Sequence, residues 1–279
     1  MRFTKMHGIG NDYIYLDCIN NTPERLADLA IEMSDRHTGV GGDGIILICS
    51  SSVADFKMLI FNADGSEAKM CGNASRCVAK YVFEKGLTDK KEISLETLSG
   101  IKYLHIHETE GHVDMVTVDM GVPLFTPASI PVIFDGDKMV EQEVAAGDKR
   151  FAVTAVSMGN PHGVIFVDSL DCADVHGDGP LLECHPIWTD RANIEFAEVI
   201  SPAEIKMRVW ERGSGETMAC GTGACATAVA GAVTGRTSRH VTIHLRGGDL
   251  DILWDPDDGH VYMTGAAETV FEGVYMRKH

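Results

Sequence analysis

Two cysteines in matching surroundings are the residues whose type and spacing point most directly to chemistry. Cys71 lies in KMCGNASRC and Cys220 in MACGTGAC, and each precedes a helical stretch that ends fifteen residues later, at Gly86 or Gly235. A helix N-terminus has free N–H groups and a partial positive charge, so it can lower the pKa of a thiol or hold a carboxylate. Because both cysteines occupy such a place, we predict that they act as a functional pair.

The two cysteines belong to an internal repeat. A shift of 149 residues places Cys71 on Cys220, Gly72 on Gly221, Asn73 on Thr222, Glu67 on Glu216 and Phe61 on Trp210. Near the start of each half, Tyr13–Asp17 resembles Val164–Asp168 at a shift of 151, and each segment follows a turn that contains Asn11 or Asn160. The repeat predicts two copies of one α/β domain related by a pseudo-twofold axis, with the two cysteines facing each other across a cleft.

The remaining pattern places helices and strands around these residues. The stretch after Cys220 consists almost wholly of Ala, Val, Thr, Gly and Cys, and a helix without a polar face is normally buried on all sides. Helical spacing over 23–37, with Thr22 as N-cap, predicts a further helix. The segments 95–107 and 112–119 read as two paired strands. Chain crossings near 121–123 and 260–265 predict one domain of residues 1–121 plus the tail from about 265 to 279, and a second of 122–264.

Composition excludes several classes of partner. The net charge of −17 argues against nucleic acid and anionic membrane surfaces as partners. The N-terminus has no apolar signal-peptide region, and no run reaches membrane-spanning length, so we expect a cytoplasmic protein. The glycine turns lack both the dinucleotide and the phosphate-loop spacings. In a reducing compartment the eight cysteines are expected to be thiols.

A facing pair of cysteines has three candidate chemistries. A disulfide switch needs only proximity, but Cys-x-x-Cys is absent. A metal site fits poorly, because Cys77 and Cys225 lack zinc-ligand spacing and lie inside apolar helices, where we expect a structural role. In the third, a thiolate removes a proton from one face of a carbon while a thiol donates one to the opposite face, which inverts a stereocentre. Backbone N–H groups at the two helix N-termini would stabilise the carboxylate of an amino-acid substrate. No lysine motif suggests pyridoxal phosphate.

The motifs MHGIGNDY, FNADGSEAKMCGNASRC, SMGNPH, RANIEF, ERGSGETMACGTGACA and YMTG together resemble the diaminopimelate epimerase family over nearly the whole chain. The resemblance implies an isomerase that interconverts LL- and meso-diaminopimelate without a cofactor or metal, in lysine and peptidoglycan precursor biosynthesis. It implies an α/β (α+β) fold of two pseudo-symmetric domains. Each is a strongly curved, mostly antiparallel sheet wrapped around a central apolar helix, with the active site in the cleft between the domains.

The resemblance also implies roles for individual residues. Cys71 and Cys220 become the acid/base pair, and His162 and Glu211 tune the two thiols. Arg212 suits a distal carboxylate and Glu211 an ammonium. The substrate-binding set is Asn11, Asn62, Gly72, Asn73, Asn160, Asn193, Glu211, Arg212, Gly221 and Thr222.

Two alternatives remain open at this point. One is a cofactor-independent racemase of another amino acid on the same fold, which would not need the distal set. The other, from a different class, is a thiol–disulfide redox protein, which activity under full reduction would distinguish. The expected partner is a small amino-acid substrate, and a second copy of the chain, in a homodimer, is a candidate partner.

Overall fold

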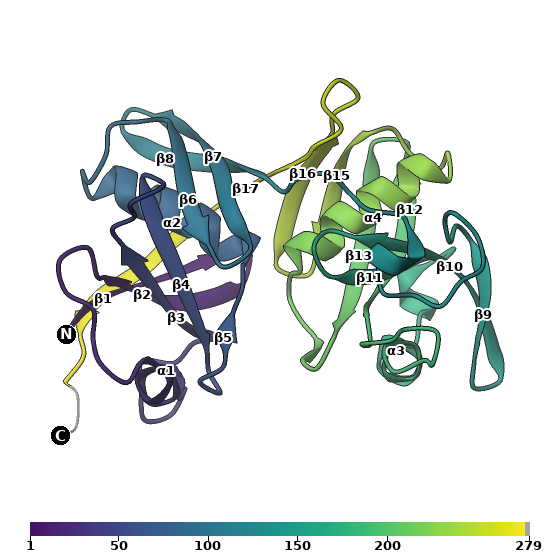
Figure 1. Cartoon of the computed structure of the whole chain (residues 1–279), viewed down its shortest axis with the longest axis horizontal. Helices are drawn as coiled ribbons and strands as arrows, with labels where there is room; N and C mark the ends of the chain where they lie inside the picture. The colour runs from purple at the N-terminus through teal and green to yellow at the C-terminus, as the bar shows by residue number, and fades with distance from the viewer. Residues whose placement is uncertain (277–279) are drawn as a thin grey trace. The chain divides into compact units, whose positions relative to one another are not determined.

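The structure is a computed structural model that describes residues 1–276, and the chain forms two compact units (Figure 1). Unit 1 consists of Met1–Asp119 together with residues 264–276, and unit 2 consists of Met120–Met263. The chain therefore begins and ends in unit 1, where the ammonium of Met1 donates to the carbonyl of Tyr275 at 2.8 Å.

Unit 1 contains two helices and a sheet whose strands are neighbours in the order β18-β1-β2-β3-β4-β6-β7-β8. The pairs β2–β3 and β4–β6 are parallel, the other pairs are antiparallel, and β5 pairs with β4. The elements are β1 (Arg2–Gly8), β2 (Asn11–Asp17), α1 (Leu26–Ser34), β3 (Gly44–Cys49), β4 (Phe56–Asn62), β5 (Glu67–Ala68), α2 (Gly72–Glu84), β6 (Glu92–Thr97), β7 (Gly100–Thr109), β8 (His112–Asp119) and β18 (Glu268–Val274).

Unit 2 repeats this arrangement, with the strand order β9-β10-β11-β12-β13-β15-β16 and β14 paired to β13. Its parallel pairs, β11–β12 and β13–β15, occupy the same places in the order as those of unit 1. The elements are η1 (Pro127–Ser129), β9 (Gln142–Ala146), β10 (Lys149–Ser157), β11 (Pro161–Phe166), η2 (Leu170–Cys172), α3 (Val175–Glu183), β12 (Asn193–Ser201), β13 (Glu204–Glu211), β14 (Gly215–Glu216), α4 (Gly221–Val233), β15 (His240–Leu245) and β16 (Gly248–Trp254). Strand β17 (Val261–Gly265) begins in unit 2 and ends in unit 1.

The repeat holds element by element at 149 residues. Both ends of α1 and α3 differ by 149, as do both ends of α2 and α4. The two long helices also end alike, because Gly86 and Gly235 follow them with positive φ (68° and 70°). The same backbone bond closes each end, Leu87 N–H to Val82 O and Arg236 N–H to Gly231 O, both at 2.9 Å.

One part of the predicted repeat is wrong, namely the shift of 151 for the early strands. In the parallel pairs, Tyr13 lies opposite Gly44 and His162 lies opposite Asn193. Each member of the second pair follows its counterpart in the first by 149 residues. Side chains in a strand alternate with a period of two, so a slip of two residues preserves the apolar pattern and hides the true register.

Two predicted elements need correction. The helix predicted over 23–37 is α1, which begins only at Leu26, and Thr22 is not its N-cap. Arg25 occupies that position. Its left-handed backbone (φ 56°) interrupts the helical conformation, so Pro23 lies outside α1. The strand predicted over 95–107 is two strands, β6 and β7, separated by a turn. Gly100 has φ 100° there, and the hydroxyl of Thr97 donates to the carbonyl of Gly100 at 2.7 Å.

In each unit the sheet curves around one helix. Helix α2 contacts β1, β2, β7 and β8, which come from opposite parts of the strand order, and α4 contacts β10, β11, β12, β13, β15 and β16. Because α4 carries only small and apolar side chains, it is buried on nearly every side, as predicted. Helix α1 packs on β2, β3 and β4 with Leu29, Ala30 and Met33, and all six residues of β3 are buried. The α/β fold class predicted from the sequence is confirmed.

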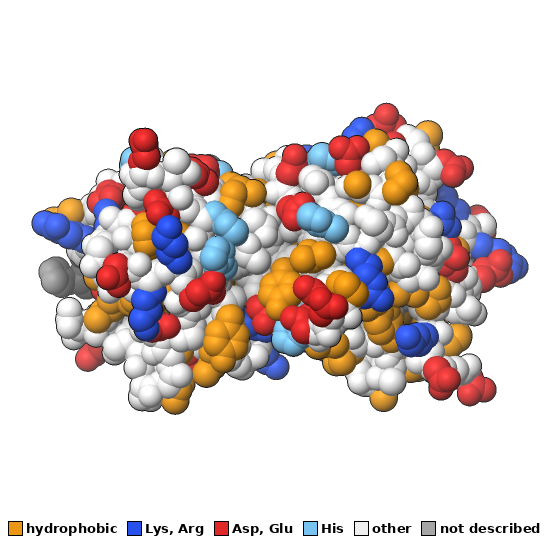
Figure 2. Space-filling view, turned by 90° about the horizontal axis from the view of Figure 1, so that it is seen from above, with side chains coloured by type: hydrophobic (Ala, Val, Ile, Leu, Met, Phe, Trp, Pro, Cys, Tyr) orange, Lys and Arg blue, Asp and Glu red, His pale blue; other side chains and the backbone are white. Residues whose placement is uncertain are grey.

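The surface carries charges of both signs. On the face drawn in Figure 2, acidic and basic side chains are interspersed, with small apolar areas between them. Among residues 1–276, no helix is long and apolar enough to cross a membrane.

Candidate active site

Each predicted catalytic cysteine is the N-cap of the long helix of its unit. Cys71 precedes α2 and Cys220 precedes α4, both with extended backbones. The third N–H of each helix points at the sulfur: Ala74 N lies 3.5 Å from Cys71 Sγ and Gly223 N lies 3.4 Å from Cys220 Sγ. The first two N–H groups of a helix have no acceptor within it, so the backbone of the residue pairs that follow the cysteines can bind an anion.

In unit 1 the thiol of Cys71 is held by Asn11, the first residue of β2. The Cys71 thiol donates to Asn11 Oδ1 at 3.2 Å, and Asn73 Nδ2 lies 3.5 Å from the same oxygen. Asn11 is oriented in turn by Asp43, whose carboxylate accepts from Asn11 Nδ2 at 2.8 Å. The amide oxygen of Asn11 therefore faces the sulfur, where it stabilises the protonated thiol.

Two charged side chains that the sequence did not single out fix the residues around Cys71. Arg36 donates to Asp43 at 3.0 Å and thereby fixes the carboxylate that orients Asn11. Arg76, fully buried in α2, donates to Asn73 Oδ1 at 2.9 Å and so directs the amide nitrogen of Asn73 toward Asn11. Asn62 ends β4 opposite Gly44, the residue after Asp43, and its amide donates to the hydroxyl of Ser66 at 3.0 Å.

In unit 2 the equivalent positions form a longer chain of polar contacts. Thr222 Oγ1 lies 3.5 Å from Cys220 Sγ and accepts from Asn160 Nδ2 at 3.3 Å. Asn160 Oδ1 faces His162 Nε2 at 3.0 Å, and His162 Nδ1 lies 2.7 Å from Glu195 Oε1. The predicted tuning residue His162 thus reaches the thiol through Asn160 and Thr222.

The pair of His162 and Glu195 is completely buried, with both side chains at 0% exposure. The Asn160 amide nitrogen donates to Thr222, so its oxygen accepts from His162, which places a proton on Nε2. Glu195 Oε2 has no hydrogen-bond partner among the described residues. A Cβ on Gly223 would lie 2.7 Å from Glu195 Oε1, so glycine is needed where this carboxylate passes under the first turn of α4.

Glu211 lies directly beside Cys220 at the end of β13. Its carboxylate interacts with the Cys220 thiol and accepts from the hydroxyl of Thr217. Burial raises the pKa of Glu211, which the bond from Thr217 opposes. Burial also raises the pKa of Cys220 well above its usual value, and the carboxylates of Glu211 and Glu195 raise it further. The environment therefore keeps Cys220 a thiol unless its proton is taken up nearby.

A pH experiment follows from this arrangement. Glu211→Gln removes a negative charge that disfavours the thiolate, so the pKa of Cys220 should fall and alkylation by iodoacetamide should reach its half-maximal rate at a lower pH. The rate is measured by mass spectrometry of Cys220 across a pH series. Glu216→Gln is the matched control, because Glu216 pairs with Arg208 at 2.7 Å. Identical pH profiles for the two variants would contradict the assigned influence of Glu211.

Arg212 and Asn193 form the outer part of the unit 2 cluster. Arg212 Nη1 pairs with the carboxylate of Asp190 at 2.7 Å, and about a third of its side chain is exposed (34%). The amide of Asn193 is engaged with backbone, accepting from Arg212 N at 3.0 Å and donating to the carbonyl of Pro161 at 3.0 Å. Asn193 thus fixes the start of the turn that carries Arg212.

The predicted residues therefore form two groups, one in each unit. Unit 1 gathers Asn11, Cys71, Gly72 and Asn73, and it holds Asn62 at the end of β4. Unit 2 gathers Asn160, His162, Asn193, Glu211, Arg212, Cys220, Gly221 and Thr222. The sequence reading missed Arg36, Asp43, Arg76 and Glu195. Glu195 had a signal, since it is a lone acid inside the apolar strand segment NIEF. The described part of the chain holds no cluster of three or more His, Cys, Asp or Glu side chains placed to bind a metal ion.

Solved structures define the class of fold. A phenazine biosynthesis protein of the PhzF family from Bacillus anthracis matches with a TM-score of 0.72 at 18% identity, covering 99% of each chain. A hydroxyproline epimerase from Agrobacterium vitis matches with a TM-score of 0.68 at 16% identity, covering 98% of this chain and 90% of that one. The chain thus has the fold shared by PhzF proteins and racemase-like epimerases.

Sequence relatives define the family within that class. The diaminopimelate epimerase family model matches residues 3–126 and 154–270. Diaminopimelate epimerases from Acetivibrio thermocellus and Parabacteroides distasonis are 53% and 54% identical over 273 residues, covering 98% of this chain and 98% and 97% of the relatives. The chain belongs to the diaminopimelate epimerase family and is an isomerase, so the resemblance drawn from its motifs is confirmed.

Proposed function

We propose that this protein converts LL-diaminopimelate to meso-diaminopimelate with two cysteines as its acid and base, and that it uses no cofactor. One observation carries the proposal. Cys71 and Cys220 are N-caps of equivalent helices 149 residues apart, and each sulfur lies beside an equivalent polar pair, Asn11 with Asn73 or Asn160 with Thr222. A repeat that preserves both thiols and their surroundings fits two groups acting on opposite faces of one carbon.

The surroundings of the two thiols differ in a way that suits opposite roles. Asn11 Oδ1 accepts a hydrogen bond from the Cys71 thiol, and Asn11 offers this sulfur no base. Cys220 lies against the Glu211 carboxylate, which is able to take up the thiol proton as Cys220 becomes the base. In the reverse direction the Cys71 thiolate removes the proton and Cys220 supplies one.

The substrate carboxylate next to the reacting carbon would bind the two helix N-termini, through the N–H groups of Gly72, Asn73, Gly221 and Thr222. Removal of a Cα proton shifts negative charge onto this carboxylate, so fixed N–H donors stabilise the transition state more than the ground state. Each helix terminus contributes about 0.3–2 kcal/mol to a bound negative charge. Glycine directly after each cysteine allows the close approach that such binding requires.

The far end of diaminopimelate carries a second amino-acid group, and the Arg212 region supplies groups that complement it. The guanidinium of Arg212 can pair with the distal carboxylate in a two-pronged arrangement. A shorter amino acid would have no group for it. The product of this reaction would serve lysine and peptidoglycan precursor synthesis.

The choice of substrate can be tested with purified enzyme and no added cofactor. A chiral assay of LL-diaminopimelate beside a panel of ordinary amino acids should show epimerisation of diaminopimelate alone. Turnover of a shorter amino acid in place of diaminopimelate would overturn the substrate assignment and leave the two-thiol chemistry standing.

Arg212→Lys should raise KM for diaminopimelate by about 10- to 100-fold with a smaller effect on kcat, because an ammonium cannot reproduce the guanidinium fork and a charge-assisted hydrogen bond contributes about 1.5–3 kcal/mol. Steady-state kinetics measure both KM and kcat of the variant. Asp190→Asn is the matched control. The Asp190 side chain is 78% exposed, so loss of its ion pair should change KM by less than about fivefold. Unchanged KM in Arg212→Lys would remove the distal-carboxylate role.

A further inference from the structure

Two cysteines outside the epimerase site lie next to each other in unit 1. Cys18 directly follows β2 and Cys49 ends β3; the two strands are parallel, with Asp17 opposite Ile48. The N–H of Cys18 continues the ladder by donating to the Ile48 carbonyl at 2.8 Å. Neighbouring strands lie about 4.8 Å apart, which is within the Cα separations of about 4.4–6.8 Å that a disulfide spans. Each of the two thiols also shifts the pKa of the other.

Their surroundings make the two thiols unequal. Cys49 lies opposite Lys57 of β4, so Cys18, Cys49 and Lys57 form a row across three strand ends. The neighbouring Cys18 thiol lowers the pKa of Cys49 to about 7 against the effect of burial, with further help from Thr22 and from the charge of Lys57. The Cys49 thiol in turn raises the pKa of Cys18. Cys49 is thus the nucleophile of the pair, and Cys18 is the protonated partner beside it.

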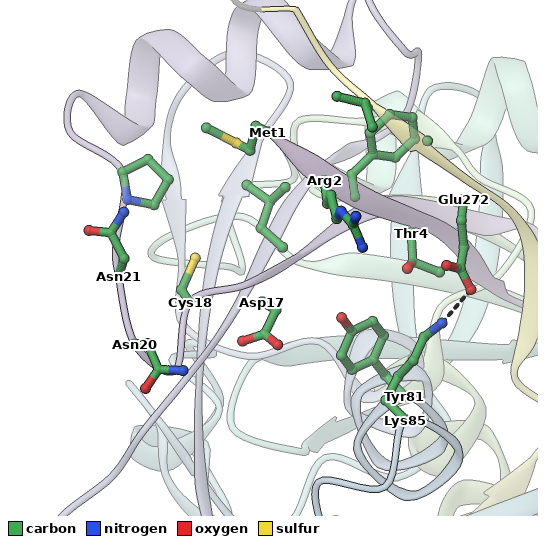
Figure 3. A pocket seen from close by; sticks show the side chains of 15 residues that line it. Met1, Arg2, Thr4, Asp17, Cys18, Asn20, Asn21, Tyr81, Lys85 and Glu272 are labelled. Carbon is green, nitrogen blue, oxygen red and sulfur yellow. Dashed lines mark hydrogen bonds and ion pairs between the residues drawn. The ribbon is translucent and has the colours of Figure 1, made fainter.

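Cys18, but not Cys49, lines a cavity of about 1000 Å³ in unit 1 (Figure 3). Cys18 lies on its wall with Asp17, Asn20, Asn21 and Pro23, opposite the β1–β18 strand pair and Tyr81. None of the residues assigned to the epimerase site lines this cavity. Cys18 and Cys49 are 4% and 8% exposed, whereas Cys77 in α2 is fully buried and its pKa is raised by that burial to about 11. Cys77 is therefore a natural internal reference for reactivity.

We propose that Cys18 and Cys49 form a peroxide-responsive dithiol that closes to a disulfide between β2 and β3. The Cys49 thiolate attacks one peroxide oxygen: an S–O bond forms, the O–O bond breaks, hydroxide leaves, and the sulfur is oxidised to a sulfenic acid. The Cys18 sulfur, after losing its proton, then attacks the Cys49 sulfur, the S–S bond forms, the S–O bond breaks, and water leaves. Two thiols are oxidised by two electrons, and hydrogen peroxide is reduced to two waters.

The expected consequence is a more stable unit 1. The link would close a loop of about 30 residues that includes α1, and a cross-link of that length restricts the unfolded chain. The strands it joins are already paired, so the link needs no rearrangement of the fold. The melting temperature should therefore rise by several degrees on oxidation and return after treatment with dithiothreitol.

Peptide mapping tests the proposal on the full chain. Reduced protein is treated with hydrogen peroxide, its remaining thiols are blocked with N-ethylmaleimide, and it is digested with trypsin. Residues 6–25 and 37–57 form two tryptic peptides with one cysteine each, Cys18 and Cys49, so a link between them is unambiguous. The linked pair should form before the peptide of residues 77–80, which holds Cys77, loses its labelling. It should disappear on reduction.

Cys18→Ser is the matched variant, with Cys18→Ala as a second in case the first fails to fold. In either variant the linked peptide should be absent and the oxidative rise in melting temperature should vanish. In Cys18→Ser, where a hydroxyl keeps a polar group beside Cys49, Cys49 should form an adduct with dimedone as a sulfenic acid. The proposal is overturned if Cys49 of the unaltered chain keeps its labelling as long as Cys77 does. It is also overturned if Cys49 is oxidised to a sulfinic acid without linking to Cys18, or links to another cysteine.

Discussion

Replacing either Cys71 or Cys220 by alanine should lower the rate of epimerisation by about 10³-fold or more. Positioned proton transfer contributes about 10²–10⁴-fold, and inversion needs a donor on one face and an acceptor on the other, so neither cysteine can substitute for its partner. Both cysteines are N-caps, but alanine there costs only about 0.5–2 kcal/mol of stability. The variants should therefore remain folded and bind substrate, which circular dichroism and calorimetry can verify.

The matched controls are Cys77→Ala and Cys225→Ala. These thiols are buried inside the same two helices, at 0% exposure, and their predicted role is structural. Both controls should keep turnover within a few-fold of the unaltered enzyme. Near-normal turnover in either Cys71→Ala or Cys220→Ala would show that the thiol in question is not part of the acid/base pair.

Glu195→Met should destabilise unit 2 by about 3–5 kcal/mol, because it removes one partner of a fully buried pair and leaves His162 without its carboxylate. Glu195→Gln keeps a hydrogen-bonding group beside His162 Nδ1 and should cost less. Chemical denaturation, followed with a probe located in unit 2, measures the free energy of unfolding of the two variants. The double variant Glu195→Met/His162→Leu should recover part of the loss, since it removes both polar groups together.

The Glu195 variants also separate support of the fold from support of the chemistry. In Glu195→Gln the fold should survive, while the orientation of His162, and through Asn160 and Thr222 the surroundings of Cys220, should change. We expect kcat to fall more than KM rises. If Glu195→Met is as stable as the unaltered protein, the buried pair does not have the energetic role assigned to it.

Much of the fold and the central residues could be predicted from the sequence, for identifiable reasons. The cysteine blocks repeat with nearly the same letters, so their spacing of 149 is readable without a structure. The burial of helix α4 can be predicted because its sequence has no polar face. The slip to 151 in the early strands arose because strand patterns repeat every two residues, and only the pairing of Tyr13 with Gly44 fixes the register.

What the sequence did not reveal depends on contacts between distant residues. Asp43 orients Asn11 across 32 positions, and the Cys18–Cys49 pair exists only because β2 and β3 are parallel neighbours. Arg76 looks like an ordinary helix-surface arginine until the curved sheet encloses it. Contacts of this kind depend on which strands and helices become neighbours in the fold. Local sequence propensity does not specify that.

The central claim is that two different groups, one for each face, carry the protons, and a solvent-deuterium experiment tests it most directly. Unlabelled LL-diaminopimelate is incubated with the enzyme in D₂O without added cofactor, and the reaction is stopped at low conversion. The meso product should carry one deuterium at the inverted carbon, while the remaining LL substrate keeps its protium, because the thiol that donates is not the thiolate that abstracts. Product that retains the substrate's own proton would show one group serving both faces, and would contradict the two-thiol account.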